Sequence, residues 1–399
     1  MRIIYHHRTR STDAQRIHIQ EIVKAFETLG HEVEMVSLVP IDTGKYDAQR
    51  DAGDAWWKKL VRRIPFSYDL VQLGYNVIGL PMILAACVSR RADFIYERYS
   101  LLNFAGVLAA RIYRIPIILE VNSPFALEQT RDGEIQLRGF ANWSERVICS
   151  LASHVIVVST PLRRILVQNG VEARKIEVMT NGVCLESFRS QPASPELERK
   201  LGLQDSTVIG FVGWFRKWHG LELLLDAFRR ENLVSEKVKV LMIGDGPAMT
   251  GLQEFVQANG LTESVIFTGP LPHAEVPAHL DLIDIAVQPA ANEYCCPMKL
   301  LEYMALGKAI VAPRQENIEE VVREGREAAF FTPENVESLG GALRALVQNR
   351  ALQEELGRRA QAAIDERGFL WAENARRVVL MVDAVPSEEA MPKKGAIST

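Results

Sequence analysis

A lysine and a glutamate, Lys299 and Glu302, lie close together in a segment that predicts a short helix. Pro297 is typical of the first turn of a helix, and Gly307 is typical of a helix end. The apolar run Ala309–Ala312 then predicts a strand. The segment therefore predicts a loop, a helix and a strand, with both charged side chains near the start of the helix.

The start of this helix could bind an anion beside a group that accepts hydrogen bonds from hydroxyls. The first backbone N–H groups of a helix, here around Met298 to Leu300, lack partners within the helix and attract an anion. Lys299 lies nearby, and Glu302 follows one turn later. A nucleoside diphosphate offers both a diphosphate and ribose hydroxyls. An ordinary amphipathic helix with a solvated lysine and glutamate is the alternative interpretation.

The segment from Pro297 to Lys308 is similar to the nucleotide-sugar site of the family 4 glycosyltransferases, which are retaining transferases of the GT-B fold. A second stretch, Gly210–Gly220, resembles the glycine-initiated loop of the same family. The resemblance covers nearly the whole chain. It implies an α/β protein of two doubly wound, Rossmann-like domains that face each other across a cleft.

The glycine-initiated loop offers both close backbone approach and cations. Gly213 permits a ligand to approach the backbone, and Arg216 and Lys217 suit phosphate oxygens. His219 stands where the family has a lysine and Trp214 where it often has an arginine, so Arg216 is a candidate for the displaced charge; a purely structural turn is the alternative. The donor-binding residues that the resemblance implies are Gly213, Arg216, Lys217, His219, Met298, Lys299, Leu300 and Glu302.

Polar residues near the end of a predicted buried strand are candidates for the acceptor side. Many relatives carry a histidine near the sugar, close to the place where Asn122 falls in this sequence. An asparagine can hydrogen-bond sugar hydroxyls but cannot carry a proton between groups. The acceptor-side candidates are Arg98, Glu120, Asn122 and Glu128. A helix cap at Ser123 and an arginine that fixes its own loop are the structural alternatives.

The family tends to have a glutamate near the sugar, eight positions before the residue that Glu302 matches. This position is Tyr294 here, and Glu293 is displaced from it by one. Because a loop can absorb such a shift, the resemblance implies catalytic roles for Glu293, Asn122 and Arg216. The alternative is a nucleotide-sugar-binding partner protein without catalysis, which the departures at Asn122, Trp214, His219 and Tyr294 would explain.

The elements that must position these residues follow an alternating pattern. A chain of 399 residues exceeds what one hydrophobic core usually organises. Short apolar runs alternate with longer helical ones, which predicts parallel sheets of βα units; Ala309–Ala312 is the last predicted strand. The predicted parts are an acceptor-side domain at 1–188, a linker at 189–205, a donor-binding domain at 206–365, a helix crossing back to the first domain at 366–385 and a disordered tail at 386–399.

Composition narrows the class of protein. A net charge of −4 gives no sign of a nucleic-acid partner, so phosphate recognition must come from local groups. Five cysteines without metal-ligand spacing fit the reducing cytoplasm. We expect no metal, no cofactor, no secretory signal and no uncharged apolar run long enough to span a membrane. A dinucleotide oxidoreductase is a poor alternative, because His6–Asp13 lacks the required glycine motif.

Two segments of the first domain suit a membrane surface. Trp56–Phe66 mixes aromatic and basic residues, and Tyr75–Val88 is largely apolar. Such a surface fits an anionic bilayer, where lipid-linked acceptors lie. A core helix with a solvated, charged rim is the alternative.

The resemblance and the residues together predict a metal-independent, retaining glycosyltransferase of bacterial type. It would move a sugar from a nucleoside diphosphate such as UDP or GDP to a hydroxyl of a glycan or lipid-linked saccharide, in polysaccharide or glycolipid synthesis. Lys299, Arg216 and the helix start would stabilise the leaving diphosphate in place of a metal ion. The expected location is the cytoplasm or the inner face of the cell membrane.

Overall fold

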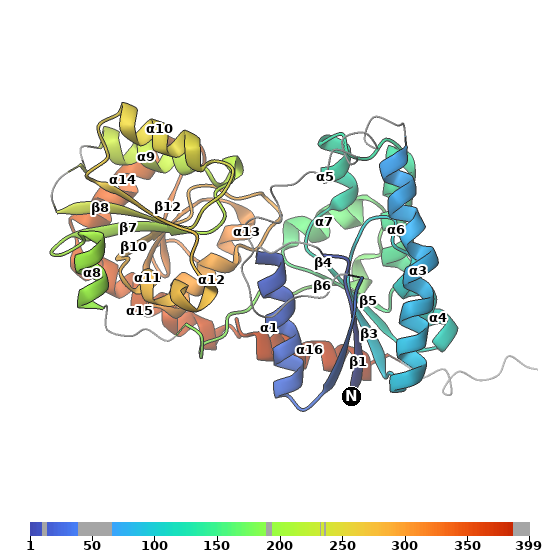
Figure 1. Ribbon diagram of the computed structural model, residues 1–399. Helices are drawn as coiled ribbons and strands as arrows, with labels where there is room; N and C mark the ends of the chain where they lie inside the picture. Colours follow the sequence, from blue (N-terminus) through green and yellow to red (C-terminus); the bar gives the residue numbers. More distant parts are fainter. Residues whose placement is uncertain (10–13, 39–65, 189–193, 232, 235–236, 386–399) are drawn as a thin grey trace, which may run out of the picture.

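The computed structural model describes residues 1–9, 14–38, 66–188, 194–231, 233–234 and 237–385. These residues form two α/β units, each built on a six-stranded parallel sheet with helices on both faces (Figure 1). The predicted fold class is therefore confirmed.

The first sheet has the strand order β2-β1-β3-β4-β5-β6. Side chains alternate across it, so that Ile3 and Tyr5 pack into one core layer and Ile4 packs into the other. The order of the strands reverses between β1 and β3, and ligands of such sheets bind at the carboxyl ends beside this reversal. Its strands are β1 (Arg2–His6), β2 (Glu32–Val36), β3 (Phe94–Arg98), β4 (Ile117–Val121), β5 (His154–Val157) and β6 (Ile176–Val178).

Helices cover both faces of this first sheet (Figure 1). α3 and α4 pack together on one side, with buried residues such as Ile83 and Val107 in their shared core. The helices of this unit are α1 (Ala14–Thr28), α3 (Ser67–Arg90), α4 (Ala105–Tyr113), α5 (Phe125–Arg131), α6 (Arg138–Leu151), α7 (Thr160–Gln168) and the short η1 (Ala173–Lys175).

The second sheet has the order β12-β11-β10-β7-β8-β9, so its reversal lies between β7 and β10. Its strands are β7 (Thr207–Val212), β8 (Val238–Ile243), β9 (Val265–Gly269), β10 (Ile285–Val287), β11 (Ala309–Pro313) and β12 (Ala328–Phe331). Its helices are α8 (Pro195–Leu201), η2 (Lys217–His219), α9 (Leu221–Arg230), α10 (Met249–Ala258), η3 (His273–Glu275), α11 (Val276–Asp281), α12 (Met298–Ala305), α13 (Glu316–Glu319), α14 (Val336–Val347) and α15 (Arg350–Glu366). The sequence did not predict β12, because four residues at the edge of a sheet give too short an apolar pattern.

The last helix, α16 (Trp371–Asp383), packs against the first unit rather than the second (Figure 1). Trp371 and Val378 share a core with Ile19 and Phe26 of α1. The ring of Trp371 also meets His18 edge-on, with 4.7 Å between the ring centroids. α16 therefore packs against α1, the helix that faces the second unit.

The long helix α3 corrects one expectation. Residues 70–89 contain no charged residue, and α3 is long and apolar enough to cross a membrane by length and composition. The prediction that no such run exists was therefore wrong. The inner face of α3 nevertheless belongs to the core of the first unit, since Tyr75, Ile83 and Cys87 are buried there.

Parts of some predictions lie outside the described residues. These are the aromatic and basic segment up to residue 65, linker residues 189–193 and the predicted tail at 386–399. The predicted domain boundaries stay predictions.

Candidate functional site

The helix predicted to bind a diphosphate is α12, which follows the loop after β10. Pro297 lies directly before its first residue, and Gly307 ends the segment with a φ of +63°. Asn317 fixes the loop, because its amide donates to the backbone oxygens of Asn292 (3.0 Å) and Cys295 (2.7 Å). The helix start thus lies at the carboxyl end of β10, next to the reversal in strand order.

Lys299 lies directly over the loop that follows β7. A Cβ atom added to Gly213 would be 3.3 Å from Cε of Lys299 and 3.6 Å from its Nζ, and the φ of +143° at this position favours glycine. The ammonium lies 4.7 Å from the ring centroid of Phe211 and 3.4 Å from Nε2 of His219. Burial lowers the pKa of Lys299 to about 8. The two segments that the family resemblance singled out therefore meet at one cation.

His219 does not supply the charge of the lysine that the family has in its place. Burial, followed by the charge of Lys299 and that of Arg216, lowers the pKa of His219 to about 2. The imidazole is therefore neutral at physiological pH. Arg216 and Lys217 are exposed on the same loop and add two further positive charges to the second unit.

The loops after β7 and β8 approach each other at backbone distance. A Cβ atom on Gly244 would be 2.1 Å from the backbone oxygen of Gly213, and one on Gly246 would be 2.5 Å from the backbone nitrogen of Phe215. The φ angles of Gly244 and Gly246 are +123° and +153°. Glycine at these positions therefore lets the loops after β7 and β8 pack closely together. Gly213, which Lys299 approaches, belongs to this contact.

Glu302 lies half-buried on α12, one turn beyond the helix start. Burial raises the pKa of its carboxyl group to about 7, while the charge of Lys299 lowers it and that of Glu21 raises it. Glu21 belongs to α1 of the first unit, so this helix faces α12 across the gap between the units (Figure 1). The site therefore holds a carboxylate that a neighbouring hydroxyl or cation would help to ionise.

Three of the four acceptor-side candidates form one cluster at the carboxyl ends of β3 and β4. Oε1 of Glu120 accepts bonds from Asn122 (2.6 Å) and Arg98 (3.4 Å), and His18 Nε2 lies 2.9 Å from the same oxygen. Burial raises the pKa of Glu120, but the bonds and charges of His18, Arg98 and Asn122 outweigh it and hold the pKa at about 2. Oε2 of Glu120 is buried and lacks a hydrogen-bond partner among the described residues.

A second buried cluster joins β1, β3 and α3. His6 Nδ1 lies 2.5 Å from Glu97 Oε2, and its Nε2 lies 2.8 Å from the hydroxyl of Tyr75. All three side chains are buried. This cluster was not predicted from the sequence, although a charged or polar residue at the end of an apolar strand, as at His6 and Glu97, is a signal that indicates such a cluster.

The fourth acceptor-side candidate, Glu128 on α5, joins the two units. Its carboxylate accepts a hydrogen bond from the hydroxyl of Tyr294, and burial raises the pKa of Glu128. Ser159 donates to the backbone oxygen of Tyr294 (2.7 Å), and Asn181 donates to that of Cys296 (2.7 Å). The first unit therefore holds the loop that leads into α12.

The predicted catalytic carboxylate Glu293 does not join these contacts. Its side chain is exposed, and it makes no hydrogen bond within the part of the chain that the structure describes. Tyr294 is buried in its place and points to Glu128. The charges of Lys299 and Glu128 both act on the thiol of Cys295, which lies on the loop before α12.

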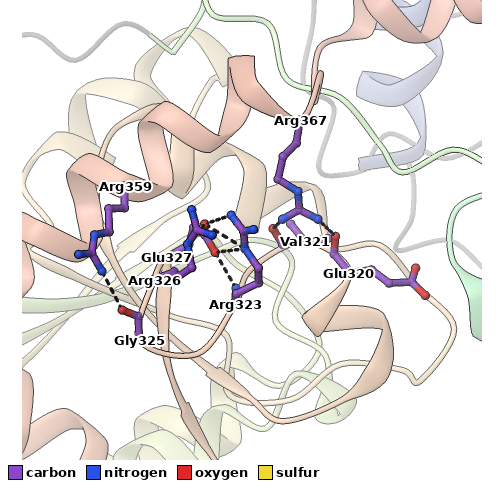
Figure 2. A network of polar contacts seen from close by, with 8 residues as sticks. All are labelled: Glu320, Val321, Arg323, Gly325, Arg326, Glu327, Arg359 and Arg367. Atoms are coloured by element: carbon purple, nitrogen blue, oxygen red, sulfur yellow. Dashed lines mark hydrogen bonds and ion pairs between the residues drawn. The ribbon is translucent and has the colours of Figure 1, made fainter.

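A polar network joins the end of α15 to the segment after α13 (Figure 2). Arg367 donates to the backbone oxygens of Val321 (2.7 Å) and Glu320. The side chain of Glu320 in turn accepts the backbone N–H of Thr160 through both oxygens, at 3.0 and 3.1 Å. The carboxylate thus caps the start of α7, where the helix dipole favours a negative charge. The strands and loops of the site are therefore held in a defined relative position.

The arrangement brings the start of α12, the half-buried ammonium of Lys299 and the carboxylates of Glu302 and Glu120 to the space between the two sheets. Lys299, His219, Gly213 and Glu302 form the group on the second unit. Arg98, Glu120 and Asn122 form the group on the first. The sequence did not reveal the pairing of His18 with Glu120, because no local pattern relates a helix residue to a distant strand end.

Two family models match the two halves of the chain. The model described as "Glycosyltransferase Family 4" matches residues 15–187, and that described as "Glycosyl transferases group 1" matches residues 193–363. The boundary between the two matches falls before β7, so each sheet belongs to one match.

The chain is also similar to individual glycosyltransferases. The chain is 25% identical over 320 residues to a D-inositol 3-phosphate glycosyltransferase of Corynebacterium urealyticum, covering 76% of this chain and 73% of that protein. It is 24% identical over 232 residues to an uncharacterized glycosyltransferase of Methanocaldococcus jannaschii. The latter alignment covers 58% of each protein, which is less than two thirds of that relative.

Solved structures share the fold. The crystal structure of Anabaena HepE in complex with UDP matches 96% of this chain and 100% of its own, with a TM-score of 0.72 and 19% identity. At this identity the likeness shows the fold alone, which is that of the GT-B glycosyltransferases.

Proposed function

The chain belongs to the glycosyltransferases that these two models describe, and we propose that it transfers a sugar from a nucleoside-diphosphate sugar to a hydroxyl acceptor, with retention of anomeric configuration and without a metal ion. The acceptor is a glycan or a lipid-linked saccharide, as in bacterial polysaccharide or glycolipid synthesis. The reaction takes place in the cytoplasm or on the inner face of the cell membrane.

The observation that carries this proposal is the position of Lys299 over Gly213 at the start of α12. A diphosphate placed there would meet an ammonium and the first N–H groups of the helix, which favour negative charge. It would raise the pKa of Lys299 from about 8 and so keep the ammonium charged. Glu302 would accept hydrogen bonds from the ribose hydroxyls.

Catalysis would depend on stabilising the diphosphate as it leaves the sugar. As the bond between the sugar and the diphosphate breaks, negative charge grows on the diphosphate, and Lys299 and Arg216 would stabilise it in a fixed position. The cluster of Glu120, Asn122 and Arg98 would orient the acceptor hydroxyls, since positioning alone removes much of a barrier of this kind. Glu128, held by Tyr294 beside the same loop, is better placed to meet the sugar than the exposed Glu293.

The donor base is best sought first among uridine nucleotides. The Anabaena protein of the same fold was solved with UDP, and its structure matches 96% of this chain. We therefore propose UDP-sugars as donors ahead of GDP-sugars.

The test is a donor panel with purified protein. UDP- and GDP-sugars would be incubated with and without EDTA, and transfer to hydroxyl acceptors or slow hydrolysis of the donor would be followed by NMR. The expected result is one base whose sugar is consumed equally in EDTA, with the anomeric configuration of the donor kept in the first product. A product of inverted configuration, or a strict metal requirement, would contradict the proposal.

A second candidate function is a nucleotide-sugar-binding partner protein that does not catalyse transfer. The exposure of Glu293 and the replacement of the expected carboxylate by Tyr294 favour it. In the same panel, donor binding without transfer to any acceptor and without hydrolysis would support this function instead.

A further inference from the structure

The outer face of α3 is an apolar surface that none of the described residues covers. It presents Leu70 and Val77, which are 64% and 77% exposed, together with Val71, Ile78 and Val88. These positions recur at the spacing of one helix face. Exposed apolar side chains occur singly on most soluble proteins, whereas a stripe along a whole helix marks a surface that meets something apolar.

The neighbouring helix extends this surface. α4 packs alongside α3, and it exposes Leu108 and Ile112. Both helices lie on the side of the first unit that faces away from the second (Figure 1). We call the exposed residues of α3 and α4 the outer apolar face; they are Leu70, Val71, Val77, Ile78, Val88, Leu108 and Ile112.

The exposed charges on α3 and α4, and directly at their ends, have one sign. Asp69 is the one acidic residue in the sequences of α3 and α4, and it is buried, where it accepts backbone N–H groups of Gln136 and Leu137. The exposed charges at the ends of the two helices are arginines: Arg90, Arg91, Arg111 and Arg114. Of these, Arg90 pairs with Glu34 at 2.9 Å. An apolar face with a cationic margin matches an anionic bilayer surface, in which acyl chains lie beneath negative headgroups.

The packing of α3 against the sheet is incompatible with a helix that crosses a membrane. Although α3 is long and apolar enough to span a membrane, its inner face is locked into the sheet by Ile83, Cys87 and Tyr75. Tyr75 also reaches the cleft side of the sheet through its bond to His6. The start of α3 contacts the segment after α5 through Gln136, which accepts the backbone N–H of Phe66 (3.2 Å). The apolar face therefore ends near the acceptor side of the candidate site.

We propose that the outer apolar face of α3 and α4 docks the protein onto an anionic lipid bilayer, with the helices parallel to the membrane. The sequence directly before α3, which lies outside the described residues, contains two tryptophans and four cations in Trp56–Arg63; the proposed surface does not include them. Docking in this orientation goes beyond the proposed transfer reaction. It brings the acceptor side of the cleft to the depth at which lipid-linked saccharides emerge.

The test uses the full chain and vesicles of phosphatidylcholine, with or without phosphatidylglycerol, in a sedimentation assay. We expect the protein to bind the anionic vesicles, and binding to fall about tenfold or more in the double variant Leu70→Gln/Val77→Gln. Leu380→Gln is a matched control, because Leu380 is 65% exposed on α16, where it lies outside the outer apolar face. Arg111→Gln should weaken binding to vesicles that contain phosphatidylglycerol. Any binding to vesicles of pure phosphatidylcholine should stay the same.

Three results would overturn the proposal. The protein could fail to bind either kind of vesicle. The double variant and Leu380→Gln could weaken binding equally. Light scattering could show a dimer that the double variant converts to a monomer without any vesicle binding, which would make this face a contact between two copies of the chain. Nucleotide binding measured without vesicles should be the same in all variants, so a failure of the proposed function is recognised separately.

Discussion

Replacing Glu302 by glutamine should make the empty protein more stable and its donor binding weaker. Burial raises the pKa of this carboxyl group from an ordinary value of 4.5 to about 7. The folded protein therefore holds the proton more tightly than the unfolded chain between these two pH values. The free energy of unfolding consequently falls as the pH rises from 4.5 to about 7, because the folded protein must give up this proton. Above pH 7 the destabilisation stays constant.

The size of the stability change follows from the shift in the pKa of Glu302. A change from 4.5 to about 7 corresponds to about 3 kcal/mol above pH 7, and screening of a half-buried group reduces this to about 2 kcal/mol. In a domain of this size, about 2 kcal/mol raises the melting temperature by about 4–8 °C. Near pH 5 only about a quarter of the effect should remain, because the carboxyl group is then mostly protonated in the folded protein.

The assay is thermal melting of the parent and Glu302→Gln at pH 5 and pH 8, without nucleotide. Glu254→Gln serves as a control, because Glu254 is exposed on α10. In a parallel titration with the preferred donor, Glu302→Gln should bind about tenfold more weakly, as expected for the loss of a charged hydrogen-bond acceptor. An equal melting temperature for both proteins at pH 8, or a difference that does not depend on pH, would refute the reasoning.

The remaining predictions concern the cation, the contact between the units and the strand-end loops. Lys299→Met should reduce donor affinity at least about tenfold in calorimetry with little change in circular dichroism, and equal affinity would contradict the site. In the parent, affinity for the donor should fall as the pH rises above about 8, because burial lowers the pKa of Lys299 to about 8 and the ammonium is lost; a flat profile from pH 7 to 10 would count against this. Tyr294→Phe should lower the melting temperature by removing the hydrogen bond to Glu128, with a cost of about 1–2 kcal/mol, and no change would mean that this contact adds no stability. Gly244→Ala should destabilise the protein by about 2 kcal/mol or more, because its Cβ would lie 2.1 Å from a backbone oxygen, whereas Gly251→Ala on α10, where nothing lies within 4 Å, should not.

The fold was accessible from the sequence because parallel sheets leave a strong pattern. Buried strands such as Ile117–Val121 read as short apolar runs between helices, and the structure places β4 at these residues. The edge strand β12 was missed because Ala328–Phe331 is short. The apolar run in α3 was overlooked because its glycine, asparagine and proline residues break the appearance of a continuous hydrophobic stretch.

The site was accessible only where its residues are neighbours in sequence or belong to a recognised motif. Lys299 and Glu302 lie on one short helix, so their placement near its start followed from the sequence. Tyr294 and Glu128 are separated by 166 positions, and nothing in either segment signals that they meet. His219 was expected to help bind the donor, but whether it is charged depends on its burial beside Lys299. Pairings of this kind depend on tertiary packing, which local patterns do not encode.

The most direct measurement is a crystal structure of the protein with its preferred nucleoside-diphosphate sugar. We predict density for the diphosphate at the N–H groups of Met298 and Lys299, with the ammonium of Lys299 in contact with it and the ribose at Glu302. Density for the nucleotide bound away from α12, or a diphosphate held only by side chains of the first unit, would contradict it.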